Sequence, residues 1–286
     1  MKKIGSYLKK IYSVILFLAV MGSGLSATYA WFSSNSIAET DVASGRTGTD
    51  QVELLISSDG GNAFNGGSQA VIVRVNPNAG ERLMPVSTAD LNGFVYSAGT
   101  VENEAVHFAK VEGEKYYYHG RVFLKAVAQG HDENSKLQLY LDQADTVNGS
   151  FFKNIQGYVA NAARLGMTFD GANSKIFRVS NGQNPDADRK MNTILNGVPL
   201  QENQVIALNG DSMSAVADPA QAMENYMVGA DGMPLNGTAK PLLTMEMNRV
   251  YAVDIYFYLE GCDPDCTEAV QMNELDFHLA FYGVLE

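Results

Sequence analysis

Short apolar segments separated by turn-forming residues dominate this chain from residue 52 onward. Within these segments apolar and polar residues alternate, or β-branched and aromatic residues follow one another, which is the pattern of β-strands. Clusters of Gly, Asn, Asp and Pro lie between them, as at Asn209-Gly210-Asp211. This punctuation predicts an all-β fold, an antiparallel β-sandwich. The clearest predicted strands are residues 52–56, 70–75, 116–127, 136–141, 165–169, 175–179, 250–259 and 275–284.

Two segments have helical signals instead. Residues 151–164 follow a serine and place apolar side chains at three- and four-residue spacing. Asp218 and Pro219 offer a capping carboxylate and a first-turn proline to a helix over residues 220–227. The surrounding tract, residues 180–244, is rich in Asn, Gly and Asp and has few strand signals. We expect it to be a loop-rich insertion on the sandwich surface.

The amino-terminal segment predicts export. Four lysines precede an apolar run whose densest part is residues 14–21, and small residues follow. A basic region, an apolar region of about 7–15 residues and small residues at the −3 and −1 positions are the parts of a secretory signal peptide. Thr28 and Ala30 fit the two small positions. Residues 1–30 are therefore predicted to be a signal peptide cleaved after Ala30, so that the secreted chain begins at Trp31.

A retained membrane anchor is the alternative interpretation. From Ser13 to Phe32 there are 20 residues without a charge, about the length needed to cross a bilayer. The lysines lie on the side expected to stay inside, and Trp31 and Phe32 are placed like an interfacial aromatic pair. Glycine and serine residues between positions 22 and 26 weaken the second half of this run. Under either interpretation the rest of the chain is exported, and membrane contact is confined to this segment.

The charge balance argues against a nucleic-acid partner. The chain carries 20 Lys and Arg residues against 32 Asp and Glu residues. Once the four lysines of the amino-terminal segment are removed, the net charge is −16. Nucleic-acid binding needs basic patches that neutralise phosphates. So acidic a surface instead favours solubility and repulsion between monomers.

Cys262 and Cys266 are the two cysteines of the chain. In an oxidising compartment they predict a disulfide across a tight turn, which would stabilise the fold by about 2 kcal/mol because the closed loop is short. A structural zinc site would need two more ligands. The histidines are scattered without ligand spacing, so we expect no metal and no cofactor. They are His107, His119, His131 and His278.

Catalytic signatures are absent from the sequence. It has no His-Glu-x-x-His motif, no Gly-x-Ser-x-Gly elbow, no P-loop and no dinucleotide-binding glycine pattern. The His-Asp-Glu run at residues 131–133 stands where polar turn residues are expected. Asp263 and Asp265, with Glu260 nearby, could act on a sugar only if they faced a cleft. Turn caps, or a weak calcium site, are the alternatives, and we expect no enzyme.

Aromatic residues gather at positions 116–118 and 251–258. They could form a platform on which sugars stack. Their alternation within predicted strands favours core packing and cross-strand pairing instead.

The exit of the amino-terminal segment resembles a known export signal. It is similar to the form Ala-Thr-x-Ala-aromatic-Phe-Ser/Thr-Asp/Asn of the TasA and camelysin family of Gram-positive biofilm fibre proteins, which a SipW-type signal peptidase processes. Residues 253–266 resemble the Leu-Glu-Gly-x-Asp-x-x-Cys segment of larger clostridial relatives, and residues 163–167 are similar to their central strand. The exit itself reads Ala27-Thr28-Tyr29-Ala30-Trp31-Phe32-Ser33-Ser34-Asn35.

The resemblance implies a jelly-roll β-sandwich that is secreted and polymerises into extracellular fibres. In such fibres the freed amino-terminal segment adds as a strand to the next subunit through main-chain hydrogen bonds. The polar stretch after Ile37 cannot bury itself. We therefore expect residues 31–50 to be a mobile donor arm, with Trp31, Phe32, Ile37 and Val42 as its larger apolar side chains. The partners are then the signal peptidase during export and other copies of this chain.

Three classes of function remain for the domain at residues 51–286. The first is a fibre or matrix subunit, and the alternative is a secreted or cell-surface adhesin domain that binds glycan or protein. A secreted hydrolase is the third. The sequence ends at Glu286 without a sorting motif, so we do not expect covalent wall anchoring by sortase.

Overall fold

All residues that the structure describes belong to one compact unit, Ala38–Glu286. The signal-peptide residues Thr28 and Ala30 and the arm residues from Trp31 to Val42 lie outside the described residues, so export and the arm stay predictions. No helix within the described ranges is long and apolar enough to cross a membrane. The computed structural model describes residues 52–57, 59–68, 72–75, 82–100, 106–113, 116–128, 134–143, 152–153, 159–179, 193–229, 233–234, 237–266, 270–271 and 276–286.

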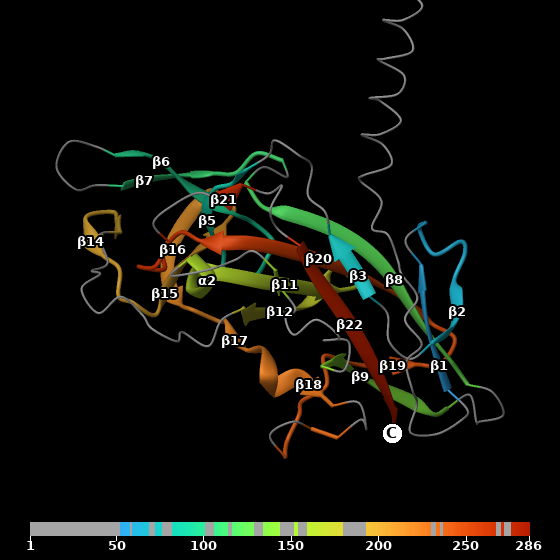
Figure 1. Ribbon diagram of the computed structural model, residues 1–286. Coiled ribbons are helices and arrows are strands. Elements are labelled where there is room, and N and C mark those ends of the chain that lie inside the picture. Colours follow the sequence, from blue (N-terminus) through green and yellow to red (C-terminus); the bar gives the residue numbers. More distant parts are fainter. Residues whose placement is uncertain are drawn as a thin grey trace, which may run out of the picture. The chain divides into compact units, whose positions relative to one another are not determined.

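The larger of two main sheets has ten strands (Figure 1). β8 (Tyr118–Ala128) pairs with both β20 (Val250–Glu260) and β1 (Val52–Ser57), and β1 also pairs with β2 (Asn65–Ser68). The end of β20 pairs with β5 instead of β8, so several elements meet there. The main path runs through β17 (Gln221–Ala222), β12 (Ala172–Arg178), β11 (Ala163–Phe169), β20, β5 (Pro85–Ser87), β6 (Val95–Thr100) and β7 (Val106–Lys110).

The second sheet has six strands, centred on the pair β22 (Asp276–Leu285) and β9 (Lys136–Asp142). β10 (Phe152–Lys153) and β3 (Ile72–Val75) pair with β22, whereas β18 (Met227–Val228) and β19 (Leu243–Glu246) pair with β9. Three two-stranded sheets complete the described strands. They are β13 (Ile194–Leu195) with β14 (Val198–Pro199), β15 (Gln204–Asn209) with β16 (Ser212–Ala217), and β4 (Arg82–Leu83) with β21 (Val270–Gln271).

The main apolar core is shared by the two sheets. Val253, Ile255 and Phe257 of β20 belong to one buried cluster with Leu139 of β9 and Phe281 of β22. Successive side chains of a strand point to opposite faces of its sheet. The even-numbered residues of β20 therefore lie on the outer face, away from this core.

The structure confirms the all-β fold class, and each of the eight predicted segments contains a strand, with small shifts at the ends. The pairing is mixed, because β20–β5, β12–β17 and β9–β18 are short parallel contacts within otherwise antiparallel sheets. The predicted turn at Asn209-Gly210-Asp211 closes the hairpin of β15 and β16, with Gly210 at φ 61°. Glycine takes this left-handed conformation without the steric cost of a Cβ atom.

The two predicted helices are much shorter in the structure. Residues 151–164 contain β10, the single turn α2 (Val159–Ala162) and the start of β11. Burial in the sheet outweighs helical spacing at this point, since β11 is buried at every position. Residues 220–227 form β17, the 3₁₀ turn η1 (Met223–Tyr226) and the start of β18. The predicted cap exists, because Asp218 Oδ1 accepts the N–H of Ala220 at 2.9 Å, but it stabilises a turn.

The tract at residues 180–244 is more integrated than its composition predicts. Its described part contains six strands, β13–β18, and the first residues of β19. Met223 and Tyr226 join the main core, and Leu200 and Ile206 form a smaller buried cluster with residues outside the tract. The expectation of a loop-rich surface insertion is therefore corrected for the described residues. Its few apolar side chains are placed where they reach two clusters.

Candidate functional site

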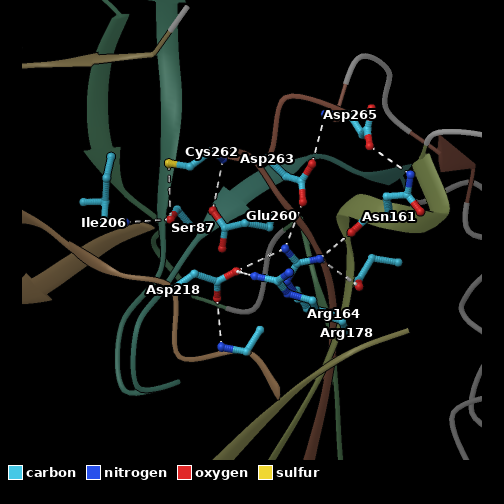
Figure 2. Close-up of polar contacts among 12 residues, drawn as sticks. Ser87, Asn161, Arg164, Arg178, Ile206, Asp218, Glu260, Cys262, Asp263 and Asp265 are labelled. Carbon is cyan, nitrogen blue, oxygen red and sulfur yellow. Dashed lines mark hydrogen bonds and ion pairs between the residues drawn. The ribbon is translucent and has the colours of Figure 1, made fainter. Parts of the chain in front are cut away.

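Buried charged residues cluster at the carboxyl end of β20 (Figure 2). Glu260 ends that strand, and Arg164 of the neighbouring β11 is aligned with Tyr258 in the register. Each of the two charged residues is 2% exposed. Asp218, in the loop before β17, and Asp263, in the turn after β20, approach from outside the sheet (Figure 2). The strands thus supply one pair of charges and two loops supply their partners.

Arg164 is the centre of this cluster. Its guanidinium donates to the main-chain oxygen of Asn161 at 2.5 Å, to Asp263 at 2.9 Å and to Asp218 at 3.4 Å. Asp218 also accepts from Arg178 at 3.0 Å. Burial alone would lower the pKa of Arg164, but the surrounding carboxylates raise it, so the guanidinium stays charged. Within the described residues, its Nε is the one buried side-chain nitrogen or oxygen without a hydrogen-bond partner.

Glu260 is a carboxyl group that titrates near neutral pH. Burial raises its pKa to about 7, although a hydrogen bond from Ser87 and the charge of Arg164 act in the opposite direction. Its Oε1 accepts the main-chain N–H of Cys262 at 3.0 Å. Ser87 is fixed in turn by the N–H of Ile206, which donates to its hydroxyl at 2.9 Å. The charge of the cluster therefore changes in the physiological pH range.

The turn after β20 is held by its own aspartates. Asp263 Oδ1 accepts the N–H of Asp265 at 3.0 Å, and the Asp263 main-chain oxygen accepts the N–H of Cys266 at 2.9 Å. Asp265 accepts a hydrogen bond from the side-chain amide of Asn161 at 2.9 Å. These contacts are those of turn caps, one of the three interpretations considered from the sequence. The described ranges hold no group of three or more His, Cys, Asp or Glu residues arranged to bind a metal ion.

The predicted disulfide is not formed in the structure, where Cys262 and Cys266 are free thiols. Their side chains enter different apolar clusters. Cys262 packs with Ile206 and directs its thiol to Ser87 Oγ at 3.5 Å, whereas Cys266 packs against the main core. Burial raises the pKa of both thiols, that of Cys266 to about 12. A thiol that stays protonated is a poor nucleophile.

A cavity of about 670 Å³ lies beside the cluster. Arg164, Asp218, Glu260 and Asp263 line it, together with residues of β12, β15, β17 and η1. Carboxylates outnumber guanidinium groups in its wall by six to two. This cavity is a candidate binding site because it brings charged side chains of several elements together. The carboxylates belong to Glu202, Asp218, Glu224, Glu260, Asp263 and Asp265, and the guanidinium groups to Arg164 and Arg178.

A second charged cluster lies earlier on the same face of β20. Asp254, which is 3% exposed, accepts from Arg121 at 2.6 and 3.0 Å and from Thr168 at 3.3 Å. His119 Nε2 lies 3.0 Å from Asp254 Oδ1, and its ring stacks on Tyr256. Burial alone would raise the pKa of Asp254, but the hydrogen bonds from Arg121 and His119 outweigh it and lower the pKa. The acid is thus held ionised.

The structure divides the aromatic residues considered in the sequence. Tyr251, Phe257 and Tyr258 are buried, as expected for core packing. Tyr117 and Tyr256 are half-buried and contact the ring of Phe94. They belong to one aromatic cluster on the outer face, and the ring of Tyr256 also stacks on His119 of the second charged cluster. The run at residues 131–133 lies outside the described residues.

Sequence reasoning missed the network around Arg164. Two signals could have suggested it: an arginine inside a segment that reads as buried, and a glutamate that ends a long apolar strand. Neither signal identifies Asp218 as the partner. No protein-family model, no curated protein and no solved structure matches this chain.

Proposed function

We propose that this protein is an exported structural subunit of an extracellular fibre or matrix, in which the amino-terminal arm of one copy adds as a strand to the next copy. The observation that carries the proposal is the open outer edge of β16. The export signals and the polar arm read from the sequence support the same role. The role is structural and not enzymatic.

β16 is an edge strand without the usual protection. Among the described strands it pairs with β15 alone. Its sequence, Ser-Met-Ser-Ala-Val-Ala, has neither charge nor proline, and none of its residues is buried. Exposed edge strands commonly carry lysine, proline or a bulge that prevents pairing with another chain. β16 therefore offers its outer main-chain groups to an incoming extended segment.

The hairpin register shows which of these groups face outward. Asn209 pairs with Ser212 across a two-residue turn, and residues in that position are hydrogen-bonded to each other. Alternation along the ladder makes Ile206 and Ala215 a pair without mutual hydrogen bonds. In agreement, the N–H of Ile206 donates to Ser87 Oγ at 2.9 Å. The N–H and C=O of Ala215 therefore point away from β15.

The predicted arm has the length and the electrostatic setting that such an exchange requires. Residues 31–50 can extend over about 65 Å, whereas the six residues of β16 need about 20 Å of paired strand. The remainder can link two subunits. The net charge of −16 beyond residue 30 opposes contact between copies. Added salt should promote assembly, because the Debye length falls below about 10 Å above 0.1 M ionic strength.

Substitutions at Ala215 test the acceptor edge. Ala215→Pro removes an outward N–H that the ladder with β15 does not use, and proline is tolerated at such edge positions. Ala215→Thr is the matched control, because it keeps the N–H and suits a strand. We expect protein that begins at Trp31 to form filaments in raised salt, by negative-stain microscopy and sedimentation. The threonine variant should do the same, and the proline variant should remain in the supernatant with an unchanged circular dichroism spectrum.

Removal of the arm tests the donor side. A chain that starts at Gln51 should fold, as judged by circular dichroism, but should not sediment as a polymer. Equal polymer yield from this chain, or from the Ala215→Pro variant, would contradict strand donation to β16. A full exported chain that stays monomeric at all salt concentrations would favour the adhesin alternative.

A further inference from the structure

The hairpin of β15 and β16 is attached to the large sheet by a small contact. Among the described strands, β15 and β16 pair only with each other. The N–H of Ile206 in β15 donates to Ser87 Oγ of β5 at 2.9 Å. The Ile206 side chain is buried in a small apolar cluster that also contains Cys262 and is separate from the main core. Elements held in this way can open locally at a lower free energy than the whole domain.

Glu260 is connected to the same attachment (Figure 2). The hydroxyl of Ser87, which accepts the N–H of Ile206, donates in turn to the carboxyl group of Glu260. That carboxyl group also accepts the N–H of Cys262 at 3.0 Å. Glu260 is 2% exposed. One serine and one cysteine therefore connect a buried carboxyl group to β15.

The charges around Glu260 balance only while it is protonated. Arg164 pairs with Asp218 and Asp263. Arg178 pairs with Asp218 as well, so two cations face two carboxylates. Burial raises the pKa of Glu260 to about 7, and ionisation near neutral pH adds a negative charge that neither β5 nor β15 can compensate, since both strands are uncharged. The other titratable groups nearby are Tyr258, Cys262 and Cys266, whose pKa values are raised, and the cavity-lining carboxyl groups of Glu202, Glu224 and Asp265.

We infer that ionisation of Glu260 favours release of the β15–β16 hairpin from the large sheet, and that protonation favours its docking. Separation of Ile206 from Ser87 and Cys262 admits water to the carboxyl group, and hydration removes the cost of burying its charge. In the released form the group regains its ordinary pKa of 4.5, against about 7 in the docked form. The docked hairpin is therefore most stable below pH 4.5, and it loses stability as the pH rises through 7.

The release also bears on assembly. β16 carries the edge to which the arm of another copy is proposed to add. A docked hairpin presents this edge in one position, whereas ordering a released hairpin costs entropy on binding. Assembly is therefore expected to be favoured below neutral pH. This consequence rests on the proposed function, but the release of the hairpin does not.

Hydrogen exchange of the Ile206 amide, followed by NMR spectroscopy in low salt, measures the release in individual molecules. After correction for intrinsic exchange, the protection of Ile206 should fall by up to about 100-fold between pH 4.5 and pH 8. Val253, which lies between β8 and β11 at the centre of the large sheet, is the reference. Its exchange should be slower and more sensitive to low urea, because only global unfolding exposes it. Protection of Ile206 that does not change with pH, or equal urea dependence of the two amides, would overturn the inference.

Two glutamate variants identify the responsible group. The fall in Ile206 protection should disappear in Glu260→Gln, whose side chain has a similar size and no charge. Glu202→Gln is the matched control, because Glu202 is exposed in the turn before β15 and lines the same cavity; it should retain the full fall. An unchanged fall in Glu260→Gln, or its loss in Glu202→Gln, would overturn the inference. If Glu260→Gln does not fold, the comparison of Ile206 with Val253 in the wild type decides. Failure to assemble at every pH would contradict the fibre proposal without altering these exchange rates.

Discussion

Asp254 and Glu260 are two buried carboxyl groups on the same face of the same strand, yet their acidities move in opposite directions. The pKa of Asp254 is lowered and that of Glu260 is raised to about 7. Both lose solvent through burial, which disfavours the charged form. Asp254 receives direct hydrogen bonds from Arg121 and His119. Glu260 is enclosed more deeply and lacks such direct charged donors, so burial and partners both contribute to the difference.

The cation near Glu260 is Arg164, which forms its hydrogen bonds with other acceptors. Arg164 directs its hydrogen bonds to Asp263, Asp218 and a main-chain oxygen, so its charge acts on Glu260 only through space. The carboxyl group relies on Ser87 and the N–H of Cys262. These neutral donors do not offset the loss of water. Proximity to an arginine thus does not by itself hold an acid ionised.

Replacing the arginine of each cluster should reveal the largest difference in stability between the two clusters. Arg164→Met leaves Asp218 and Asp263 without their buried cation and should lower the free energy of unfolding by about 3–5 kcal/mol. Arg121→Met should lower it by about 1 kcal/mol, since the Arg121 side chain is 55% exposed and Asp254 keeps His119 and Thr168. Urea unfolding of both variants measures the difference. Similar losses would show that the two clusters are energetically equivalent.

The pH dependence of the free energy of unfolding should reflect the titration of Glu260. Glu260 has a pKa of about 7 in the folded state, against 4.5 for a solvent-exposed glutamate in the unfolded chain. Its contribution to stability is therefore complete below pH 4.5 and is lost as the pH rises through 7, up to about 3 kcal/mol. Asp254, with its lowered pKa, contributes above pH 3.8 and loses this as the pH falls further. The urea midpoint of the unmodified protein should fall between pH 4.5 and pH 8, and this fall should be smaller in Glu260→Gln. An unchanged pH dependence in the variant would argue against this assignment.

The neutral donors should have smaller and unequal effects. Ser87→Ala removes a hydrogen bond to Glu260 and leaves the buried N–H of Ile206 without its acceptor, so we expect a loss of about 1–3 kcal/mol. Thr168→Val removes only a long hydrogen bond to Asp254, of 3.3 Å, and should cost about 1 kcal/mol or less. Thermal unfolding compares the two. A larger loss from Thr168→Val would reverse the relative importance of these donors.

The smallest effect should come from a reducing agent, which has no disulfide to cleave if the cysteines near Glu260 are free thiols. Cys262 and Cys266 are free in the structure, so a reducing agent should not change the unfolding midpoint of the protein. Thiol titration after denaturation should find two groups per chain. If a reducing agent instead lowers the unfolding midpoint, with a loss of about 2 kcal/mol in the free energy of unfolding, the result would support the disulfide predicted from the sequence.

The local sequence pattern was sufficient to predict much of the fold but little of the candidate site. The segment at residues 250–259 reads as a strand because its apolar and β-branched residues suit a sheet, and the Asn209-Gly210-Asp211 turn follows from local backbone preference. Helical spacing in residues 151–164 was misleading, because burial in the sheet prevailed. The partner of Arg164 in the loop before β17 is 54 residues away. The alternation of residues within a strand does not identify partners that lie so far apart in the sequence.

The sequence by itself determined the all-β class and the approximate positions of eight strands, and it predicts export and a polar arm. Each of these predictions depends on the spacing of residues that are close to one another in the sequence. Only the tertiary structure decided that Glu260 shares a cavity with Asp218, that Asp254 meets Arg121, and that β16 pairs with β15 alone among the described strands. Those outcomes depend on which distant segments pack together. Acidity, cavity charge and free edges follow from that packing, because solvent exclusion and directed hydrogen bonds exist only once the segments have met.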